Sequence, residues 1–312
     1  MTTVDDQEPK TGVALSIGKR RALQALSTSE QVFAILAVDH IAALAAVARP
    51  DAPESITDED LVALKLHLVS TISQPASGVL IDPVLGLSPV VEEHALPGTT
   101  GLLIGLEDGD YSSLDGPPRL FADWDVARAA RSGATAVKIS FVYDPFSSST
   151  DAHEFVASLV DACGRHELPL FAEPLVPLTK QDNRRAVVIE AARKIGALGV
   201  DVLKLEFPSN RDNNDESEWR DACAELTAAS PRPWTLLSGG TDLATFSRQL
   251  TVACDAGASG YVAGRAVWQD LVAADSTDRA AATAEAERRL QSLTDIAAAH
   301  ATPWTSWFEH LA

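Results

Sequence analysis

Short apolar runs alternate with longer amphipathic segments along most of the chain. Most of the apolar runs are nearly continuous in hydrophobicity, which is typical of strands that are buried on both faces. The pattern predicts eight strands, at residues 33–38, 77–81, 101–106, 135–142, 169–172, 200–207, 234–238 and 260–263.

The segments between these strands have the apolar periodicity of helices that bury one face. Thr57 is a suitable N-cap for the first of them, and Gly133 follows the end of the second as a C-cap signal. The connection from 82 to 101 has no helical period and carries three prolines, so we expect it to be irregular. The predicted helices are 58–73, 123–131, 151–166, 183–198, 216–229, 242–255 and 280–300.

Eight strands with helices between them predict an α/β fold, a (β/α)8 barrel of the TIM type in a single domain. A doubly wound open sheet is the alternative. We expect the barrel to span residues 15–312 and residues 1–14 to form a disordered arm.

The acidity of the chain narrows the classes of partner. Lys and Arg total 25 and Asp and Glu total 44, which gives 25 − 44 = −19. Such a surface repels nucleic acid and anionic membranes, so we expect neither as a partner, and it also repels a phosphorylated substrate at long range. Any anion site must therefore be built locally, from a helix N-terminus, backbone N–H groups or a placed basic side chain.

No apolar run reaches the ~18 residues needed to span a membrane, and the polar, acidic N-terminus does not resemble a signal peptide. We expect a cytoplasmic protein that forms a homo-oligomer of unspecified order. Cys163, Cys223 and Cys254 lie in predicted helices without metal-ligand or redox spacing, which favours buried, reduced thiols. The histidines form no HxH or HExxH cluster, so we expect no metal and no cofactor.

In a barrel of this kind, the chemistry belongs at the C-terminal ends of the strands. Polar residues collect at these places in the sequence. The strand ends carry, in order, Asp39-His40, Asp82-Pro83, Glu107-Asp108, Tyr143-Asp144, Glu173-Pro174, Lys204 with Glu206, Ser238-Gly239-Gly240 and Gly264-Arg265, and Lys138 lies within the fourth strand.

Two lysines lie inside predicted strands. Side chains alternate along a strand, so Lys204 and Glu206 share one face, and the outer face of a barrel strand meets apolar helices. Lys204 and Glu206 should then point into the barrel, and Lys138 repeats the situation on the fourth strand. A buried lysine is rare unless it is paired or functional.

Two inward lysines in one barrel have a chemical interpretation. Attack on a carbonyl requires a neutral amine, and both desolvation and a neighbouring ammonium favour that form. One lysine would be the nucleophile and the other its cationic neighbour. Glu173, on the strand between theirs, would shuttle protons. The alternative is a pair of buried lysine–carboxylate ion pairs. Two roles remain possible for Glu206: pairing with Lys138 or Lys204, or a purely structural role. We include Glu206 among the candidate substrate-binding residues.

Two glycine turns follow the seventh and eighth strands. Ser238, Gly239 and Gly240 let the backbone approach a ligand closely, and the Gly264 turn adds the permanently charged Arg265. Many barrels bind phosphate after these two strands. The alternative is a pair of structural turns with a surface salt bridge.

Several stretches resemble the class I tagatose-1,6-bisphosphate aldolases and the bacterial sulfofructosephosphate aldolases. The resemblance spans roughly residues 30–305, and Thr302-Pro303-Trp304-Thr305 is similar to the tagatose-bisphosphate branch. The matching stretches are FAILAVD at 33–39, GATAVK at 133–138, AEP at 172–174, GVDVLKLEFP at 199–208, PWTLLSGGT at 233–241 and AGASGYVAGRAVW at 256–268.

The resemblance implies roles for several of these residues. Lys204 would form the Schiff base, Glu173 would be the general acid/base and Lys138 would lie beside them. The Ser238–Gly240 and Gly264–Arg265 turns would hold the phosphate of the dihydroxyacetone phosphate half, and Asp39 would contact substrate hydroxyls.

One position departs from the family pattern. Both related groups have Asp-Gln-Arg after the first strand, where this chain has Asp39-His40-Ile41. The distal group of the substrate is then smaller, neutral or differently held, and His40 can replace the glutamine as a hydrogen-bond donor.

The resulting hypothesis is a retro-aldol lyase that cleaves a ketose 1-phosphate, like tagatose 1,6-bisphosphate or 6-deoxy-6-sulfofructose 1-phosphate. The products would be dihydroxyacetone phosphate and a three-carbon aldehyde. The alternative enzymatic activity is a transaldolase-type transfer through the same lysine imine. The non-enzymatic alternative is a binding protein on the same barrel, which would form no reducible imine.

Overall fold

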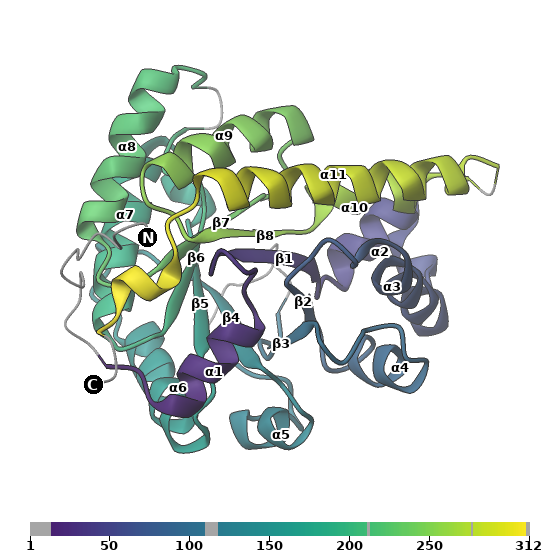
Figure 1. The fold of residues 1–312 in the computed structure, drawn as a ribbon, viewed down its shortest axis with the longest axis horizontal. Coiled ribbons are helices and arrows are strands. Elements are labelled where there is room, and N and C mark those ends of the chain that lie inside the picture. The colour runs from purple at the N-terminus through teal and green to yellow at the C-terminus, as the bar shows by residue number, and fades with distance from the viewer. Residues whose placement is uncertain (1–13, 110–117, 211–212, 276, 310–312) are drawn as a thin grey trace, which may run out of the picture.

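The computed structural model describes residues 14–109, 118–210, 213–275 and 277–309. Its centre is a closed barrel of eight parallel strands in sequential order, in which β1 pairs with both β2 and β8 (Figure 1). This confirms the (β/α)8 prediction over the open sheet. The strands are β1 (Phe33–Val38), β2 (Gly78–Ile81), β3 (Gly101–Gly105), β4 (Ala136–Val142), β5 (Leu170–Leu175), β6 (Val202–Leu205), β7 (Trp234–Leu237) and β8 (Gly260–Ala263).

The predicted helices are present on the outside of the barrel, with ends that differ from the predicted ones by up to three residues. They are α3 (Asp58–Ile72), α5 (Val126–Arg131), α6 (Asp151–His166), α7 (Arg184–Ala197), α8 (Glu216–Ala229), α9 (Leu243–Asp255) and α11 (Arg279–His300). Thr57 and Asp60 form a capping box at the start of α3, which explains why that helix begins where the sequence predicted. The three cysteines are buried and unpaired in α6, α8 and α9, as expected.

Within the described residues, four further α-helices were not predicted: α1 (Ile17–Ala25), α2 (Ala42–Ala48), α4 (Leu87–Glu92) and α10 (Arg265–Ala273). The prediction of an irregular 82–101 connection is wrong for α4, although that helix is only six residues long. Its sequence, LSPVVE, is too short to show a helical period. The three short 3₁₀ helices are η1 (Pro53–Ser55), η2 (Leu178–Asn183) and η3 (Trp304–Trp307).

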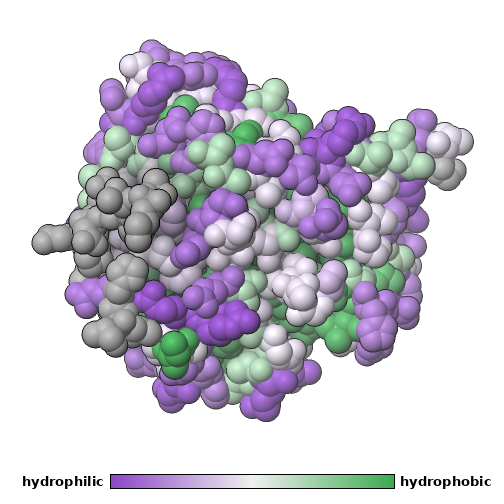
Figure 2. Space-filling view, in the orientation of Figure 1, coloured by the Kyte–Doolittle hydropathy of each residue, from purple (hydrophilic) through white to green (hydrophobic). Residues whose placement is uncertain are grey.

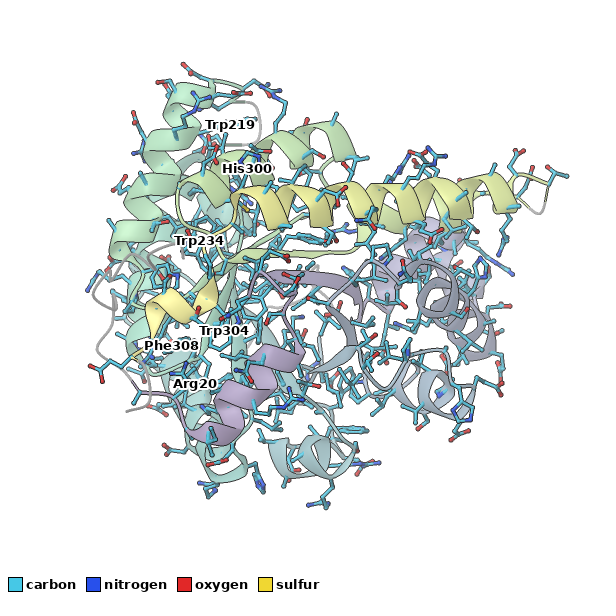
Figure 3. All side chains as sticks on the ribbon, in the orientation of Figure 1. Arg20, Trp219, Trp234, His300, Trp304 and Phe308 are labelled. Carbon is cyan, nitrogen blue, oxygen red and sulfur yellow. The ribbon has the colours of Figure 1, made fainter. Side chains whose placement is uncertain are left out.

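The N-terminal end of the barrel is closed by both ends of the described chain. Leu26, just after α1, packs against Gly78 and Gly101 at the starts of β2 and β3. Trp304 of η3 donates from its backbone N–H to Gln31 and from its indole to Ser27, beside α1 (Figure 3). A buried ion pair joins Lys19 of α1 to Asp201, with 2.7 Å between Nζ and Oδ2. The N-terminal end of the barrel is therefore filled by side chains, and a ligand can enter from the C-terminal end.

The face shown in Figure 2 is largely hydrophilic, with smaller hydrophobic patches between the polar groups. Within the described part of the chain, no helix is both long and apolar enough to cross a membrane. The predicted N-terminal arm, 1–14, falls outside the described residues except for Ala14 and stays a prediction.

Candidate active site

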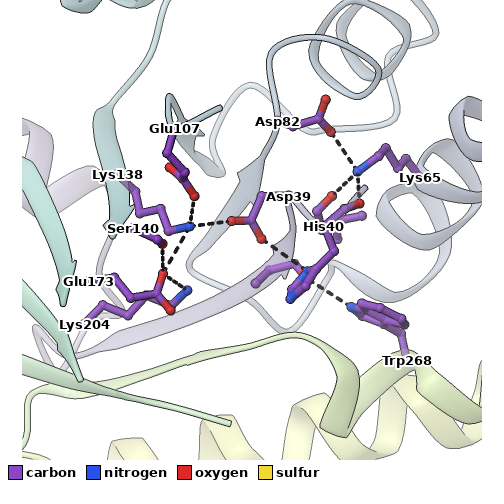
Figure 4. A network of polar contacts seen from close by, with 12 residues as sticks. Asp39, His40, Lys65, Asp82, Glu107, Lys138, Ser140, Glu173, Lys204 and Trp268 are labelled. Atoms are coloured by element: carbon purple, nitrogen blue, oxygen red, sulfur yellow. Dashed lines mark hydrogen bonds and ion pairs between the residues drawn. The ribbon is translucent and has the colours of Figure 1, made fainter. Parts of the chain in front are cut away.

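Both predicted lysines point into the barrel. Lys138 on β4 is fully buried, and Lys204 on β6 is 3% exposed. Their ammonium nitrogens meet the same carboxylate oxygen, Oε2 of Glu173 on the intervening strand β5, at 3.1 Å from Lys138 and 2.8 Å from Lys204 (Figure 4). The sequence therefore predicted the two lysines and the carboxylate between them correctly as neighbours.

Glu173 is the meeting point of this cluster. Ser140, two residues after Lys138 on the same face of β4, also donates its hydroxyl to Glu173 Oε2. Burial alone would raise the pKa of the Glu173 carboxyl, but Lys138 and Lys204 outweigh burial and lower this pKa below its ordinary value. Glu173 is therefore ionised at neutral pH in the unliganded protein.

Lys138 also contacts two further carboxylates. Its ammonium lies 2.9 Å from Asp39 Oδ2, at the end of β1, and pairs with Glu107, at the end of β3. Burial would raise the pKa of the Asp39 carboxyl, but Lys138, His40 and Lys204 together lower it. At Glu107 the balance is reversed, because burial and the neighbouring Asp39 raise its pKa against the attraction of Lys138. Glu107 therefore keeps a proton to higher pH than Asp39 does.

His40 lies between Asp39 and the eighth strand. Its Nδ1 is 3.3 Å from Asp39 Oδ1, and its ring stacks edge-on against Trp268 of α10, with 5.5 Å between ring centroids. Burial lowers the pKa of the imidazole to about 4, and Arg265 and Lys204 add to the lowering against the attraction of Asp39. A Cβ on Gly264 would lie 2.7 Å from the His40 ring and 2.9 Å from the Ala37 carbonyl, which explains the glycine. His40 is neutral at pH 7.

Lys65 of α3 binds the loop that carries Asp39 and His40. This fully buried ammonium donates to the carbonyls of Val38 and His40, each at 2.7 Å, and pairs with Asp82 at 2.7 Å (Figure 4). The sequence analysis did not select Lys65, because a lysine within an amphipathic helix ordinarily faces solvent.

The two glycine turns lie together at the ends of β7 and β8. Gly239 and Gly240 have φ of 56° and 78°, the left-handed region that favours glycine. A Cβ on Gly240 would lie 3.0 Å from the Arg265 guanidinium carbon, so the turn and this side chain are in contact. Among the described residues no carboxylate pairs with Arg265 at salt-bridge distance, in contrast to the predicted alternative of a surface salt bridge. The guanidinium is available to an anion.

Glu206 does not pair with either barrel lysine, and that alternative is wrong. Its Oε1 accepts from Arg184 at 2.5 Å and its Oε2 accepts from the Val176 N–H at 2.6 Å. Arg184, at the start of α7, also bonds the Phe207 carbonyl. Glu206 therefore fixes the loop after β5, while its carboxylate still lines the cavity described next.

A cavity of about 180 Å³, open to solvent, lies over the C-terminal ends of β5 to β8. Lys204 and Glu173 line one part of it, and Ser238, Gly240 and Arg265 line another. A second cavity of about 240 Å³ lies over β1 to β3, and His40 borders both cavities. Within the described residues, no group of three or more His, Cys, Asp or Glu side chains is arranged to hold a metal ion.

Comparison with known proteins identifies the family. The model of the DeoC/LacD family aldolases matches residues 33–270. The chain belongs to the DeoC/LacD family of aldolases. This aldolase is therefore a carbon–carbon lyase, as the motifs predicted, and the matched residues include every strand of the barrel.

Curated relatives of the aldolase include tagatose 1,6-diphosphate aldolase 2 of Enterococcus faecalis, 28% identical over 94% of this chain and 97% of the relative. The tagatose 1,6-diphosphate aldolase of Streptococcus pneumoniae strain R6 is also 28% identical, over 96% of this chain and all of the relative. The predicted resemblance to tagatose-bisphosphate aldolases is thus confirmed.

Solved structures share the fold of the aldolase at lower identity. An archaeal fructose 1,6-bisphosphate aldolase superposes with a TM-score of 0.62 at 20% identity, over 90% of this chain and 99% of that one. The Plasmodium falciparum fructose-bisphosphate aldolase superposes with a TM-score of 0.67 at 13% identity, over 95% and 99% of the two chains.

Proposed function

We propose that the protein is a class I aldolase that cleaves a ketose 1-phosphate through a Schiff base on Lys204. Dihydroxyacetone phosphate and a three-carbon aldehyde would be the products, from a ketose like tagatose 1,6-bisphosphate or 6-deoxy-6-sulfofructose 1-phosphate. The observation that carries the proposal is Lys204: a buried amine that lines an open cavity, 2.8 Å from the Glu173 carboxylate. A structural neighbour at 20% identity is a Schiff-base-forming fructose-1,6-bisphosphate aldolase.

The steps follow from the groups around Lys204. Lys204 passes a proton to Glu173, and its neutral amine attacks the C2 carbonyl. Glu173 returns the proton to the carbinolamine hydroxyl, which leaves as water and gives an iminium. The C3–C4 electron pair then moves into the iminium as the C4 hydroxyl loses its proton, which releases the aldehyde and leaves an enamine. Protonation of the enamine at C3 and attack of water at C2 release dihydroxyacetone phosphate and restore the amine.

Glu173 is suited to move these protons. It begins ionised, since the two lysines lower its pKa, so it can accept a proton first and return it later. Lys138 remains paired with Asp39 and Glu107 and holds the three carboxylates together. Asp39 contacts substrate hydroxyls near the reacting carbons, and Arg265 with the Ser238–Gly240 turn binds the C1 phosphate.

Reduction of the intermediate tests the proposal. Borohydride should inactivate the protein only when dihydroxyacetone phosphate is present, and EDTA should leave the cleavage activity unchanged. Cleavage should also proceed without an acceptor aldehyde, which separates it from a transaldolase-type transfer. Loss of activity in EDTA that zinc restores, or full resistance to borohydride with substrate, would contradict a lysine imine.

A further inference from the structure

The two cavities of the site differ in charge. In the cavity over β5 to β8, Arg265 has no carboxylate at salt-bridge distance among the described residues and lies against an exposed glycine turn. In the cavity over β1 to β3, four carboxyl groups line the wall: Asp39, Asp82, Glu107 and Asp108.

The basic groups of the second cavity are already engaged. Arg119, the one arginine or lysine among its described lining residues, is 69% exposed and pairs with Asp108 at 3.2 Å. Behind the wall, Lys138 pairs with Asp39 and Glu107, and Lys65 pairs with Asp82. His40 is neutral at pH 7, because its pKa is about 4. The residues that follow Gly109 in the sequence, 110–117, contain no lysine, arginine or histidine.

The rest of the second cavity suits an uncharged chain of hydroxyls. Ile41, Ala42, Gly105 and Phe121 give it apolar walls. Glu107 Oε2 is buried without a hydrogen-bond partner among the described residues. An unsatisfied buried acceptor costs desolvation free energy, and a ligand hydroxyl that donates to it would remove this cost. Glu107 pairs with Lys138 through its other oxygen, so its position is fixed.

We propose that the aldehyde half of the substrate binds in the second cavity and carries no phosphate or sulfonate. The cavity accepts an uncharged polyhydroxy aldehyde, whose hydroxyls donate to Glu107 and contact His40. A distal phosphate would lie among four carboxyl groups. The nearby cations, Lys65, Arg119 and Lys138, already form ion pairs with these carboxyl groups. This inference rests on the proposed function and replaces the distal phosphate or sulfonate of the examples given there with an uncharged end, so the substrate is a ketose monophosphate, whereas the named relatives are tagatose 1,6-diphosphate aldolases.

Condensation with dihydroxyacetone phosphate tests the inference. We expect kcat/KM for glyceraldehyde to exceed that for glyceraldehyde 3-phosphate by at least about tenfold, because a distal phosphate would be juxtaposed with like charges. Equal or better use of glyceraldehyde 3-phosphate would overturn the inference, while the lysine imine could still be trapped with dihydroxyacetone phosphate alone. Failure to trap that imine would instead contradict the proposed function.

A charge variant gives an independent check. Asp108→Asn removes the partner of Arg119, so it should improve the use of glyceraldehyde 3-phosphate about tenfold relative to glyceraldehyde, within the range for one charge-assisted hydrogen bond. Asp123→Asn is the matched control, because Asp123 is exposed and does not line this cavity, and it should leave the ratio unchanged. An unchanged ratio in Asp108→Asn, or an equal change in both variants, would count against the assignment of the cavity.

Discussion

Glu173 accepts hydrogen bonds from Ser140 and Lys204 on one oxygen atom, and Lys138 pairs with the same oxygen. This convergence makes it the group through which protons can pass between the lysines and a bound ketose. Its ionised state at neutral pH is a consequence of those two cations and not of solvent.

Replacement of Glu173 separates imine formation from turnover. Glu173→Gln keeps the size of the side chain and removes its proton capacity, so turnover should fall by ~10²–10⁴-fold. Imine trapping by borohydride should persist, since Lys204 remains. Near-normal turnover would show that another group moves the proton. Tyr143, at the end of β4, is an unsuitable substitute, because its hydroxyl bonds His153 at 2.5 Å and it lines neither cavity.

Arg265 should act on the phosphate alone. A charge-assisted hydrogen bond contributes about 1.5–3 kcal/mol, so Arg265→Ala should lower kcat/KM for a ketose phosphate by roughly tenfold to two-hundredfold. The loss should be small for the unphosphorylated ketose. Arg220→Ala serves as the control, because Arg220 is exposed and pairs with Glu216 within α8. Equal losses for both substrates would indicate that Arg265 has a structural role.

His40 should titrate well below an ordinary histidine. The unfolded chain binds a proton near pH 6.5, whereas the folded protein excludes it until about pH 4. Stability therefore falls as the pH drops from 6.5 to 4, by about 3 kcal/mol for this group alone. The free energy of unfolding of wild type should fall relative to His40→Asn over that window, and the His40 NMR resonance should titrate near pH 4. A midpoint above 6 would contradict the burial of a neutral imidazole.

The site residues that could be predicted from the sequence are those whose chemical type is unusual for their position in a strand. Lys138 and Lys204 were found because a lysine in an apolar strand is unusual, and Glu173 because it lies between them. Glu107 was noted only as a strand end, since a carboxylate after a strand is common and its pairing with Lys138 depends on barrel closure. Ser140 was missed, although its place two residues after Lys138 puts it on the inward face.

At the scale of elements, the strands were predicted well because burial on both faces gives each a distinct apolar run. The four unpredicted helices lacked such a signal. α2, with the sequence AALAAVA, has no polar face, and α10 begins at Arg265, with only Gly264 between it and β8. Lys65 in α3 likewise could not be predicted as a site residue, because its partners include backbone carbonyls of the β1–α2 loop, and a sequence pattern does not show such contacts.

Lys65 couples α3 to the loop that carries Asp39 and His40. Lys65→Met leaves Asp82 buried without its cation, so the variant should lose about 3–5 kcal/mol of stability, as when one partner of a buried pair is removed. The double variant Lys65→Met/Asp82→Asn should recover part of the loss, since Asn can still accept from the Val84 and Leu85 N–H groups. Denaturant unfolding of the three proteins measures this. Equal stability of both variants would show that the charge on Asp82 is unimportant.

At the scale of the whole molecule, the net charge of −19 repels the phosphorylated substrate that we propose. The fold resolves this by placing Arg265, which pairs with no carboxylate among the described residues, at one end of the site, whereas four carboxyl groups line the cavity at the other. The barrel provides this polarity because β7 and β8 end in glycine turns, whereas β1, β2 and β3 end in acidic residues. Orientation of the ketose in the site follows from this asymmetry.

The most direct measurement is the identity of the lysine that becomes covalently modified. The protein is incubated with dihydroxyacetone phosphate, reduced with borohydride, digested and mapped by mass spectrometry. The adduct should appear on the peptide that contains Lys204 and not on the one that contains Lys138, and a folded Lys204→Met variant should acquire none. An adduct on Lys138, or an active protein from which no adduct can be trapped, would contradict the assignment of Lys204 as the nucleophile.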